Sequence, residues 1–215
     1  MDEQFVDRND YWASFYSAKS RGGSLMPPSQ FAAFVAQEIE PTGVIFDVGC
    51  GNGRDSLFFA EMGFKVVSLD ASQDAIRFVE EKAKERNLDN IKFVVSDIKG
   101  PKLRETIDQL AKRKVCIYAR FFLHAINLDE QTVFLQVLSD TLKSGSRLTF
   151  EYRITEDQYL EKDAPPHFRR YQSAESLNAQ LRDLGFKEIY AIEGQGFAKY
   201  KSDDAIVARC IFEKV

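Results

Sequence analysis

The chain has 215 residues, of which 44% are hydrophobic and 29% charged, and its formal net charge is -4 at pH 7. This length suits one domain with a sizeable core, and the acidic balance gives no electrostatic reason to expect nucleic acid or an anionic membrane as a partner. No apolar run approaches the ~20 residues that a membrane-spanning helix needs, and the polar, acidic first ten residues do not resemble a secretory signal.

Residues 1–40 read as a segment that precedes the core. They contain an aromatic cluster, a loop with Gly-Gly and Pro-Pro pairs, and an apolar pattern that predicts a helix from Ser29 or Gln30 to Ile39.

From Val44 onward, short β-rich runs alternate with helical patterns. This alternation predicts crossover connections and an α/β fold with a doubly wound, mostly parallel sheet. Strands are expected at Val44–Val48, Lys65–Leu69, Ile91–Val95, Val115–Ala119 and Arg147–Tyr152, with helices at Ser56–Met62, Ser72–Arg86, Leu103–Ala111 and Glu130–Leu142.

The last third of the chain has a different pattern. A polar, charged stretch runs to Tyr171 and is followed by a helix that Ser173 caps and Gly185 ends. Two strands, Phe186–Ile192 and Ala205–Phe212, then follow without a helix between them. We expect them to form an antiparallel pair at the sheet edge.

The three cysteines, Cys50, Cys116 and Cys210, are far apart and lie in or beside apolar stretches. They have neither the spacing of metal ligands nor the density of a disulfide framework. We therefore expect unreactive thiols, a reducing cytoplasm and no metal site.

The run from Val44 to Gly53 carries most of the functional signal. An apolar strand is interrupted by Asp47, and glycines follow at positions 49, 51 and 53 before a helix begins. Glycine lets the backbone turn tightly and approach a ligand closely, so this loop predicts a bound small molecule.

Two further acidic residues close the next strands. Asp70 ends the second strand, where a carboxylate can bind ribose hydroxyls, and Asp97 ends the third, where it can hold an adenine amino group with Ile98 against the ring. The alternative is that both residues only cap the helices that follow.

The glycine spacing indicates which ligand is bound. Dinucleotide-binding loops have the pattern G-x-G-x-x-G, whereas this loop reads Gly49-x-Gly51-x-Gly53 with Asp47 two residues before it. A carboxylate there repels a pyrophosphate and attracts an ammonium group. The pattern favours an adenosine that carries an amino acid.

The segment Asp47-Val48-Gly49-Cys50-Gly51-Asn52-Gly53, followed by Asp70 and Asp97, resembles the class I S-adenosylmethionine-dependent methyltransferases. The resemblance covers Val44 to Val215 and implies a Rossmann-like, seven-stranded sheet whose last strand is antiparallel. It implies S-adenosyl-L-methionine as cofactor. The residues it assigns to that cofactor are Asp47, Gly49, Gly51 and Gly53 around the methionine part, Asp70 with Ala71 at the ribose, and Asp97 with Ile98 at the adenine.

The extension Gly53-Arg54-Asp55-Ser56 is similar to the thiopurine and tellurite-resistance methyltransferases. Arg54 is accordingly a candidate for binding the cofactor carboxylate; the alternative is a solvated residue in the first helical turn.

The N-terminal segment resembles the lid of bacterial small-molecule and polysaccharide-cluster methyltransferases. This implies that Tyr11, Tyr16 and Ser29 contact the cofactor, and aromatic rings suit a sulfonium cation. The alternative is that the aromatics cover the outside of the sheet. We expect a single domain over residues 1–215, with residues 1–40 as lid, 41–215 as core and 153–172 as a loop that covers the substrate.

The residues after the fourth strand lie nearest the methyl group in this fold. They lack the Asn-Pro-Pro-Tyr and Pro-Cys motifs that some nucleic-acid and protein methyltransferases carry, which argues against those substrates. Arg120 is a candidate catalytic residue that contacts the cofactor carboxylate or the substrate; the alternative is an ion pair with a nearby Asp. His124 is a candidate general base, and the alternative is a packing role.

A second group of candidates surrounds the fifth strand. Guanidinium groups suit phosphate and carboxylate, so the loop with Arg169 and Arg170 predicts an anionic substrate; a solvated charged loop is the alternative. The full set comprises His167 as a further catalytic residue and Glu151, Arg153, Arg169, Arg170 and Tyr171 as substrate-binding residues.

The leading hypothesis is methyl transfer to oxygen on a small polar, anionic acceptor such as a sugar, a phosphorylated glycan intermediate or a metabolite. A second hypothesis keeps the cofactor and places the methyl group on sulfur, selenium, tellurium or a ring nitrogen. A third is a catalytically silent cofactor-binding protein with a regulatory role. The oligomeric state does not follow from the sequence.

Overall fold

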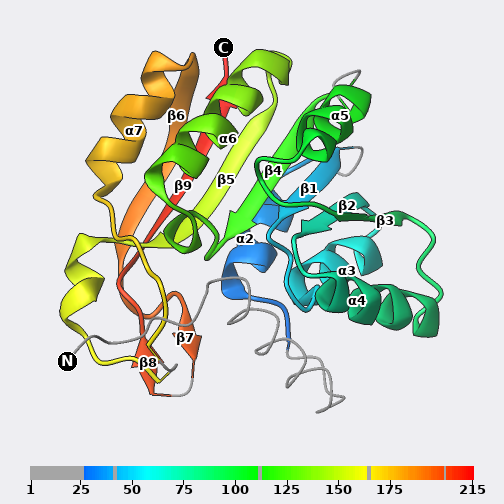
Figure 1. The fold of residues 1–215 in the computed structure, drawn as a ribbon, viewed down its shortest axis with the longest axis horizontal. Coiled ribbons are helices and arrows are strands. Elements are labelled where there is room, and N and C mark those ends of the chain that lie inside the picture. Colours follow the sequence, from blue (N-terminus) through cyan, green and yellow to red (C-terminus); the bar gives the residue numbers. More distant parts are fainter. Residues whose placement is uncertain (1–26, 41–42, 111–112, 164–165, 201) are drawn as a thin grey trace.

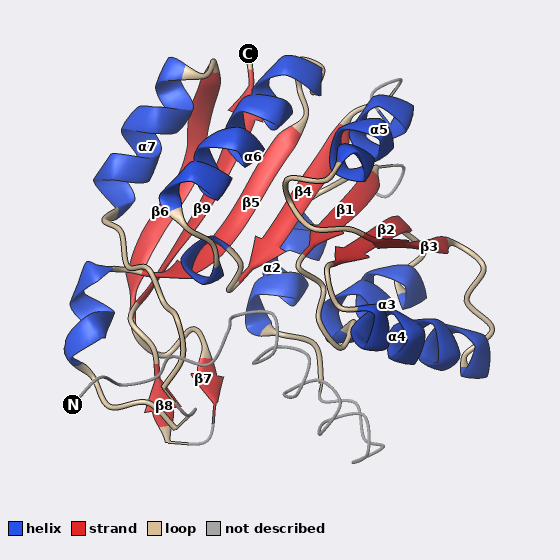
Figure 2. Ribbon diagram, viewed as in Figure 1, coloured by secondary structure: helices blue, strands red, loops and turns tan. Residues whose placement is uncertain are grey.

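The computed structural model describes residues 27–40, 43–110, 113–163, 166–200 and 202–215. In these residues a seven-stranded sheet has the strand order β3-β2-β1-β4-β5-β9-β6, with helices on both faces (Figures 1 and 2). The strands are β1 (Val44–Val48), β2 (Lys65–Asp70), β3 (Ile91–Val95), β4 (Val115–Arg120), β5 (Arg147–Arg153), β6 (Phe186–Gly194) and β9 (Val207–Lys214).

The helices agree with the periodicity of the sequence to within a few residues. They are α2 (Gln30–Glu38), α3 (Arg54–Glu61), α4 (Gln73–Glu85), α5 (Pro101–Leu110), α6 (Leu128–Thr141) and α7 (Ala174–Asp183). Polar caps start several of them: Ser29, Ser72 and Ser173 each accept from a backbone N–H in the first turn. The predicted cap at Ser173 is confirmed.

The sheet has the predicted direction of strands. Strands β1 to β5 are parallel, and β9 pairs antiparallel with both β5 and β6. The antiparallel pairing is therefore confirmed, but β9 lies inside the sheet between β5 and β6, and of these two late strands only β6 is at an edge.

Three short elements were not predicted. They are the 3-10 helices η1 (Leu123–Ala125) and η2 (Thr155–Tyr159), and a hairpin of β7 (Lys199–Tyr200) and β8 (Asp203–Asp204). Residues this few carry no periodic pattern, so local sequence gives no signal for them. Figure 1 shows η2 and the hairpin together beyond the carboxyl ends of β4 and β5.

Two hydrophobic clusters cover the two faces of the sheet. One joins residues of α5, α6 and α7 to the sheet, including Phe134, Phe150 and Phe212; the other joins α2, α3 and α4, including Phe31 and Tyr118. Because the sheet is buried on both sides, its parallel strands are almost continuously apolar.

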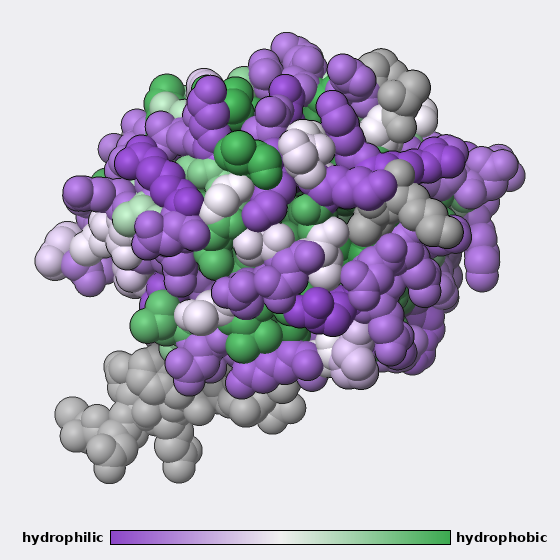
Figure 3. Space-filling model, turned by 90° about the horizontal axis from the view of Figure 1, so that it is seen from above, coloured by the Kyte–Doolittle hydropathy of each residue, from purple (hydrophilic) through white to green (hydrophobic). Residues whose placement is uncertain are grey.

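None of the described helices is long and apolar enough to cross a membrane. Seen from above, hydrophilic side chains predominate and apolar ones form small separate patches (Figure 3). The predicted lid over residues 1–40 stays a prediction, because Tyr11, Tyr16 and the other residues before Pro27 lie outside the described residues.

Candidate active site

The glycine loop between β1 and α3 is held against the end of β2. Gly49 and Cys50 both donate their backbone N–H to the carbonyl of Leu69, at 2.8 and 3.0 Å. Gly51 donates its N–H to Oδ2 of Asp70 at 2.8 Å. These three bonds hold the carboxyl ends of β1 and β2 together.

All three glycines have left-handed backbones, with φ of 73° at Gly49, 57° at Gly51 and 67° at Gly53. A Cβ atom at Gly49 would lie 2.5 Å from the ring of Phe122, and one at Gly53 would lie 2.3 Å from Val79 of α4. The loop thus needs glycine for its backbone conformation and for close packing. This tight backbone cradle fits the methionine part of S-adenosylmethionine.

Asp47 lies at the floor of this loop and is buried. Desolvation raises its pKa to about 8, although the hydroxyl of Ser56 donates to Oδ2 at 2.5 Å and partly offsets the effect. With this pKa the buried carboxyl group is mostly protonated at pH 7, and a cation beside it would favour the ionised form. The cofactor's ammonium group fits this position.

Asp70 lies where the resemblance places the ribose partner. Its Oδ1 accepts from the N–H of Ser72 and its Oδ2 from Gly51, both at 2.8 Å. Burial raises the pKa of this carboxyl group. The sequence left open that Asp70 only caps the following helix. In the structure the hydroxyl of Ser72, and not Asp70, caps α4.

The adenine candidates lie at the end of the neighbouring strand. Asp70 is paired with Val95, two residues before Asp97, so the two carboxylates belong to adjacent strand ends. The side chain of Asp97 is exposed and accepts from the N–H of Lys99 at 2.9 Å, whereas Ile98 is buried. Ala71 is exposed beside Asp70.

A buried network joins α2 to α3 and β4 through Asp55, a residue that was not predicted to have a role. Asp55 accepts from the N–H and the hydroxyl of Ser29 and from the hydroxyl of Tyr118, each at 2.8 Å. Arg54 lies 3.4 Å from its Oδ1. Ser29, predicted at the cofactor, therefore uses its hydroxyl in this network. No local pattern indicates this network, because its members are up to 89 positions apart.

At the mouth of β4, Arg120 pairs with Glu151 of β5. The distance from Arg120 Nε to Glu151 Oε1 is 2.7 Å, and Arg209 Nε donates to Glu151 Oε2 at 2.6 Å. Arg120 thus forms an ion pair, but its partner is a glutamate and not the expected aspartate. Glu151 is fully buried between the two arginines.

Phe121 follows Arg120 with a φ of 56°, a left-handed conformation that is costly for a bulky residue. Its ring lies 4.3 Å from the guanidinium carbon of Arg120, and its centroid is 5.2 Å from that of His124. Such strain is typical of functional sites.

His124, in η1, is buried, and its Nδ1 accepts from the backbone N–H of Arg153 at 3.4 Å. Burial lowers its pKa well below the ordinary value, and the charges of Arg153, Arg169, His167 and Arg120 lower it further. The ring is therefore neutral at pH 7, with its proton on Nε2.

The remaining substrate candidates divide into two groups. Arg153 contacts Asp157 at 2.7 Å and Asp203 at 2.6 Å, and these bonds raise its pKa although burial acts in the opposite direction. Arg170 donates to the carbonyls of Leu123 and Ile126. Both arginines therefore hold the connections that surround the site.

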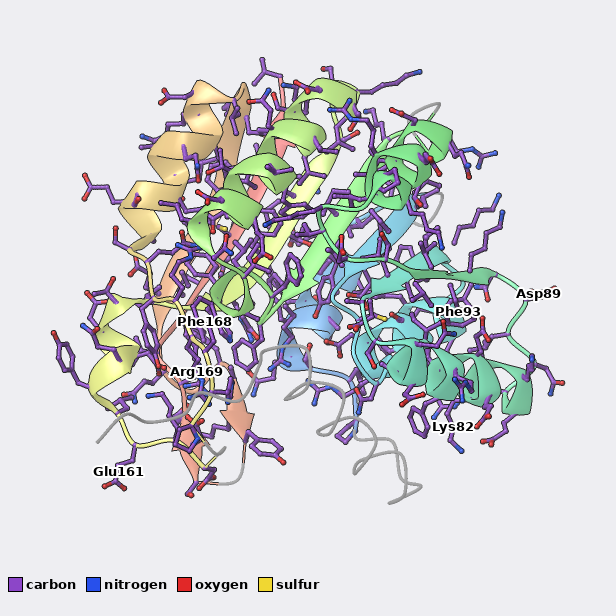
Figure 4. The ribbon with its side chains drawn as sticks, viewed as in Figure 1. Lys82, Asp89, Phe93, Glu161, Phe168 and Arg169 are labelled. Carbon is purple, nitrogen blue, oxygen red and sulfur yellow. The ribbon has the colours of Figure 1, made fainter. Side chains whose placement is uncertain are left out.

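His167, Arg169 and Tyr171 form the second group and are partly exposed. Figure 4 shows Phe168 and Arg169 on the connection between η2 and α7, past the carboxyl ends of the central strands. Burial raises the pKa of Tyr171, and the charge of Arg169 acts in the opposite direction.

No group of histidine, cysteine and acidic side chains that could hold a metal occurs in the described parts of the chain. Burial raises the pKa of Cys116 to about 12, which confirms the expectation of an inert thiol.

Residues 39–195 match a family described as "Methyltransferase domain". Among curated proteins, the chain is 28% identical over 114 residues to the probable S-adenosyl-L-methionine-dependent methyltransferase TehB of Haemophilus influenzae; this match covers 53% of the chain and 37% of that protein. It is 43% identical over 56 residues to 2-heptyl-1-hydroxyquinolin-4(1H)-one methyltransferase of Mycobacteroides abscessus, covering 26% of the chain and 25% of the relative. These matches therefore span well under half of each relative.

The fold is also similar to solved structures. A S-adenosylmethionine-dependent methyltransferase from Anabaena variabilis superposes with a TM-score of 0.71 at 20% identity, covering 98% of this chain and 96% of the other. Similarity at this level of identity establishes the fold.

Proposed function

The chain belongs to the class I S-adenosylmethionine-dependent methyltransferases, and on this premise we propose that it methylates a small polar, anionic acceptor. The acceptor is a sugar, a phosphorylated glycan intermediate or a metabolite, and oxygen is the atom methylated. The observation that supports this proposal is a set of partly exposed cationic candidates at the carboxyl end of β4. Arg120 ends that strand, and Arg169 and His167 lie on the connection between η2 and α7, which the N–H of Arg170 joins to the carbonyl of His124 at 2.8 Å. Cationic side chains at this position favour an anionic acceptor.

The residues that would hold the cofactor lie along the ends of β1, β2 and β3. In this proposal Asp47 binds the ammonium group, Arg54 the carboxylate, Asp70 the ribose and Asp97 the adenine amino group. Isothermal titration calorimetry with S-adenosylhomocysteine tests this part: we expect binding in the wild type and a marked loss with Asp70→Asn. Absence of binding at millimolar concentration would exclude the cofactor site.

The bound cofactor supplies a methyl group that its sulfonium already activates. The protein then has two tasks, which are to align the acceptor with that methyl group and to take up a proton from a hydroxyl acceptor. Arg120 lies at the strand end where it can orient the acceptor.

Of the two histidines, His167 is the better candidate for the base. His124 accepts a backbone N–H at Nδ1 and so carries its proton on Nε2, and its lowered pKa makes it a weak base. We therefore expect His167→Gln to lower kcat about 10²-fold or more and to alter the pH profile. His124→Gln is the comparison and is expected to act mainly through stability.

A sulfur, selenium or tellurium acceptor is the second candidate. It is favoured by the similarity to TehB and by the weak basicity of His124, because a soft nucleophile needs less help from a base. Unchanged turnover in both histidine variants would favour this option. A screen of anionic sugars and phosphorylated metabolites, run beside soft nucleophiles, separates the two; methyl transfer to any acceptor excludes a silent regulatory protein.

A further inference from the structure

Three charged side chains form a row across the sheet at its carboxyl edge. Arg120 of β4 is the direct neighbour of Glu151 of β5, and Glu151 is the direct neighbour of Arg209 of β9. Directly opposed residues on adjacent strands point to the same face of a sheet. The row is therefore one unit, and Arg209 is its member that the sequence did not single out.

The row has an excess positive charge. Glu151 is fully buried and has one arginine at ion-pair distance from each carboxylate oxygen, so two guanidinium groups share one negative charge. Of the two contacts, only that with Arg209 has the geometry of a hydrogen bond. The nearby Asp55 has Arg54 as its own partner. Asp47, with a pKa of about 8, is mostly uncharged at pH 7 and adds no compensation before a cation binds.

The guanidinium groups keep unused donors. Each has five N–H bonds, and Arg209 directs its Nε to Glu151 and its Nη2 to the carbonyl of Phe197 at 2.9 Å. Arg120 contacts only Glu151, through Nε, among the acceptors of the described residues. With 18% of its side chain exposed against 8% for Arg209, Arg120 is the member that a ligand can reach.

Aromatic rings support these charges where water is scarce. Arg209 lies 4.8 Å from the ring of Phe197 and 5.4 Å from that of Phe31, while Arg120 lies over Phe121. A ring face attracts a cation without neutralising it. The surroundings therefore stabilise the excess charge and leave it available to an anion.

We propose that Arg209 determines specificity for an anionic acceptor by occupying the second oxygen of Glu151, so that Arg120 keeps a net positive charge for the acceptor's carboxylate or phosphate. Arg120 makes the contact and Arg209 acts through Glu151 as a positioning residue. This inference rests on the proposed function for the identity of the ligand as a methyl acceptor. An Arg120–Glu151 pair would already be neutral by itself. Burying a second arginine beside it costs desolvation free energy, so its presence calls for a separate role.

The test uses the full chain with saturating S-adenosylhomocysteine and inorganic phosphate as the probe. Phosphate is titrated at constant ionic strength, balanced with chloride, and the rise in Tm is recorded. We expect phosphate to stabilise the wild type. Arg209→Met, which leaves a neutral Arg120–Glu151 pair, should weaken phosphate binding about tenfold or more, while Arg209→Lys should retain most of it because the charge remains.

Two further variants make the direction of the effect decisive. Glu151→Gln removes the negative charge from the row, which makes the row more positive, and should strengthen phosphate binding. Arg147→Gln removes an arginine from the other end of β5, where it pairs with Glu213, and should leave phosphate binding unchanged. Chloride matching the phosphate effect in the wild type would overturn the inference, as would equal phosphate binding in Arg209→Met and the wild type.

The same experiment separates this inference from the proposed function. Phosphate binding that depends on Arg209, without methyl transfer to any anionic acceptor, would retain the anion site and reject the proposed function. The phosphate titration is also run without S-adenosylhomocysteine. Phosphate binding seen only in that titration would assign Arg120 to the cofactor's carboxylate and would overturn the inference. Where an acceptor is found, Arg209→Met should raise its KM with little change in kcat.

Discussion

Asp47 is the residue at which ligand binding and stability oppose one another. Its pKa rises from 3.8 to about 8 on folding, so the folded state binds more protons than the unfolded state between pH 4 and 8. The free energy of unfolding of the ligand-free protein therefore falls as pH rises through this window, by up to about 1.4 kcal/mol per pH unit from this group.

Asp47→Asn should remove this contribution. We expect the variant to be more stable than the wild type at pH 8, to show a flatter pH dependence in urea denaturation, and to bind S-adenosylhomocysteine more weakly. Asp89→Asn, at the exposed amino end of β3, is the control and should follow the wild type. If the free energy of unfolding of Asp47→Asn fell with pH as steeply as that of the wild type, the Asp47 carboxyl group would not be the source of the pH dependence.

Gly53 tests whether the glycine loop depends on packing as well as on backbone conformation. In Gly53→Ala the new Cβ atom would meet Val79 at 2.3 Å with φ at 67°. We expect a loss of about 2–4 kcal/mol in the free energy of unfolding, from strain and overpacking together. Cofactor binding should weaken with it.

Gly63→Ala is the matched control for this change. Gly63 also has a left-handed backbone, with φ of 88°, but no atom lies within 4 Å of a Cβ placed there. It should lose only the conformational part, about 1–2 kcal/mol. Equal losses in the two variants would show that packing against Val79 contributes nothing.

At the scale of elements, the start of α2 is fixed by the hydrogen bonds of Asp55. Tyr118→Phe removes the hydroxyl that donates to Asp55 at 2.8 Å and should lower the free energy of unfolding by about 1–3 kcal/mol. A double-mutant cycle with Ser29→Ala should show coupling of more than about 0.5 kcal/mol, because both side chains share one carboxylate.

Tyr152→Phe provides the comparison on the adjacent strand. The hydroxyl of Tyr152 is buried and has no hydrogen-bond partner among the described residues, so its removal should be neutral or stabilising. If Tyr152→Phe lowered the free energy of unfolding as much as Tyr118→Phe, the loss in Tyr118→Phe would be a general effect of removing a tyrosine hydroxyl and not of the hydrogen bonds of Asp55.

At the scale of the whole molecule, two thiols report global unfolding. Cys116 and Cys210 lie in interior strands, and burial raises the pKa of both. In a Cys50→Ser background we expect a thiol reagent to label them only through the unfolded state, at a rate that follows the free energy of unfolding in urea. Met62→Cys, at an exposed position, should react immediately. Fast labelling of the two native thiols in the folded protein would contradict this core.

The sequence by itself determined the order and type of the main elements. Alternating β-rich runs and helical periodicities decided the α/β class, and the glycines before α3 with Asp47, Asp70 and Asp97 decided the cofactor. These signals are local, because each depends on residues within one strand, loop or helix start. Family membership confirmed the cofactor and the fold class; the roles of the individual site residues stay predictions.

Only the tertiary structure decided how the charged candidates are used. Glu151, Arg153 and Arg170 looked alike as substrate ligands in the sequence, yet all three have internal partners. Arg209 and Asp55 had no local signal, yet each belongs to a buried network, Arg209 at one end of the row with Glu151 and Asp55 at the centre of the bonds to Ser29 and Tyr118. The physical reason is that these partners lie far apart in the chain or on other elements. The row from Arg120 to Arg209 depends on strand order and register, and the bonds of Asp55 depend on how α2 packs on the sheet, neither of which local sequence encodes.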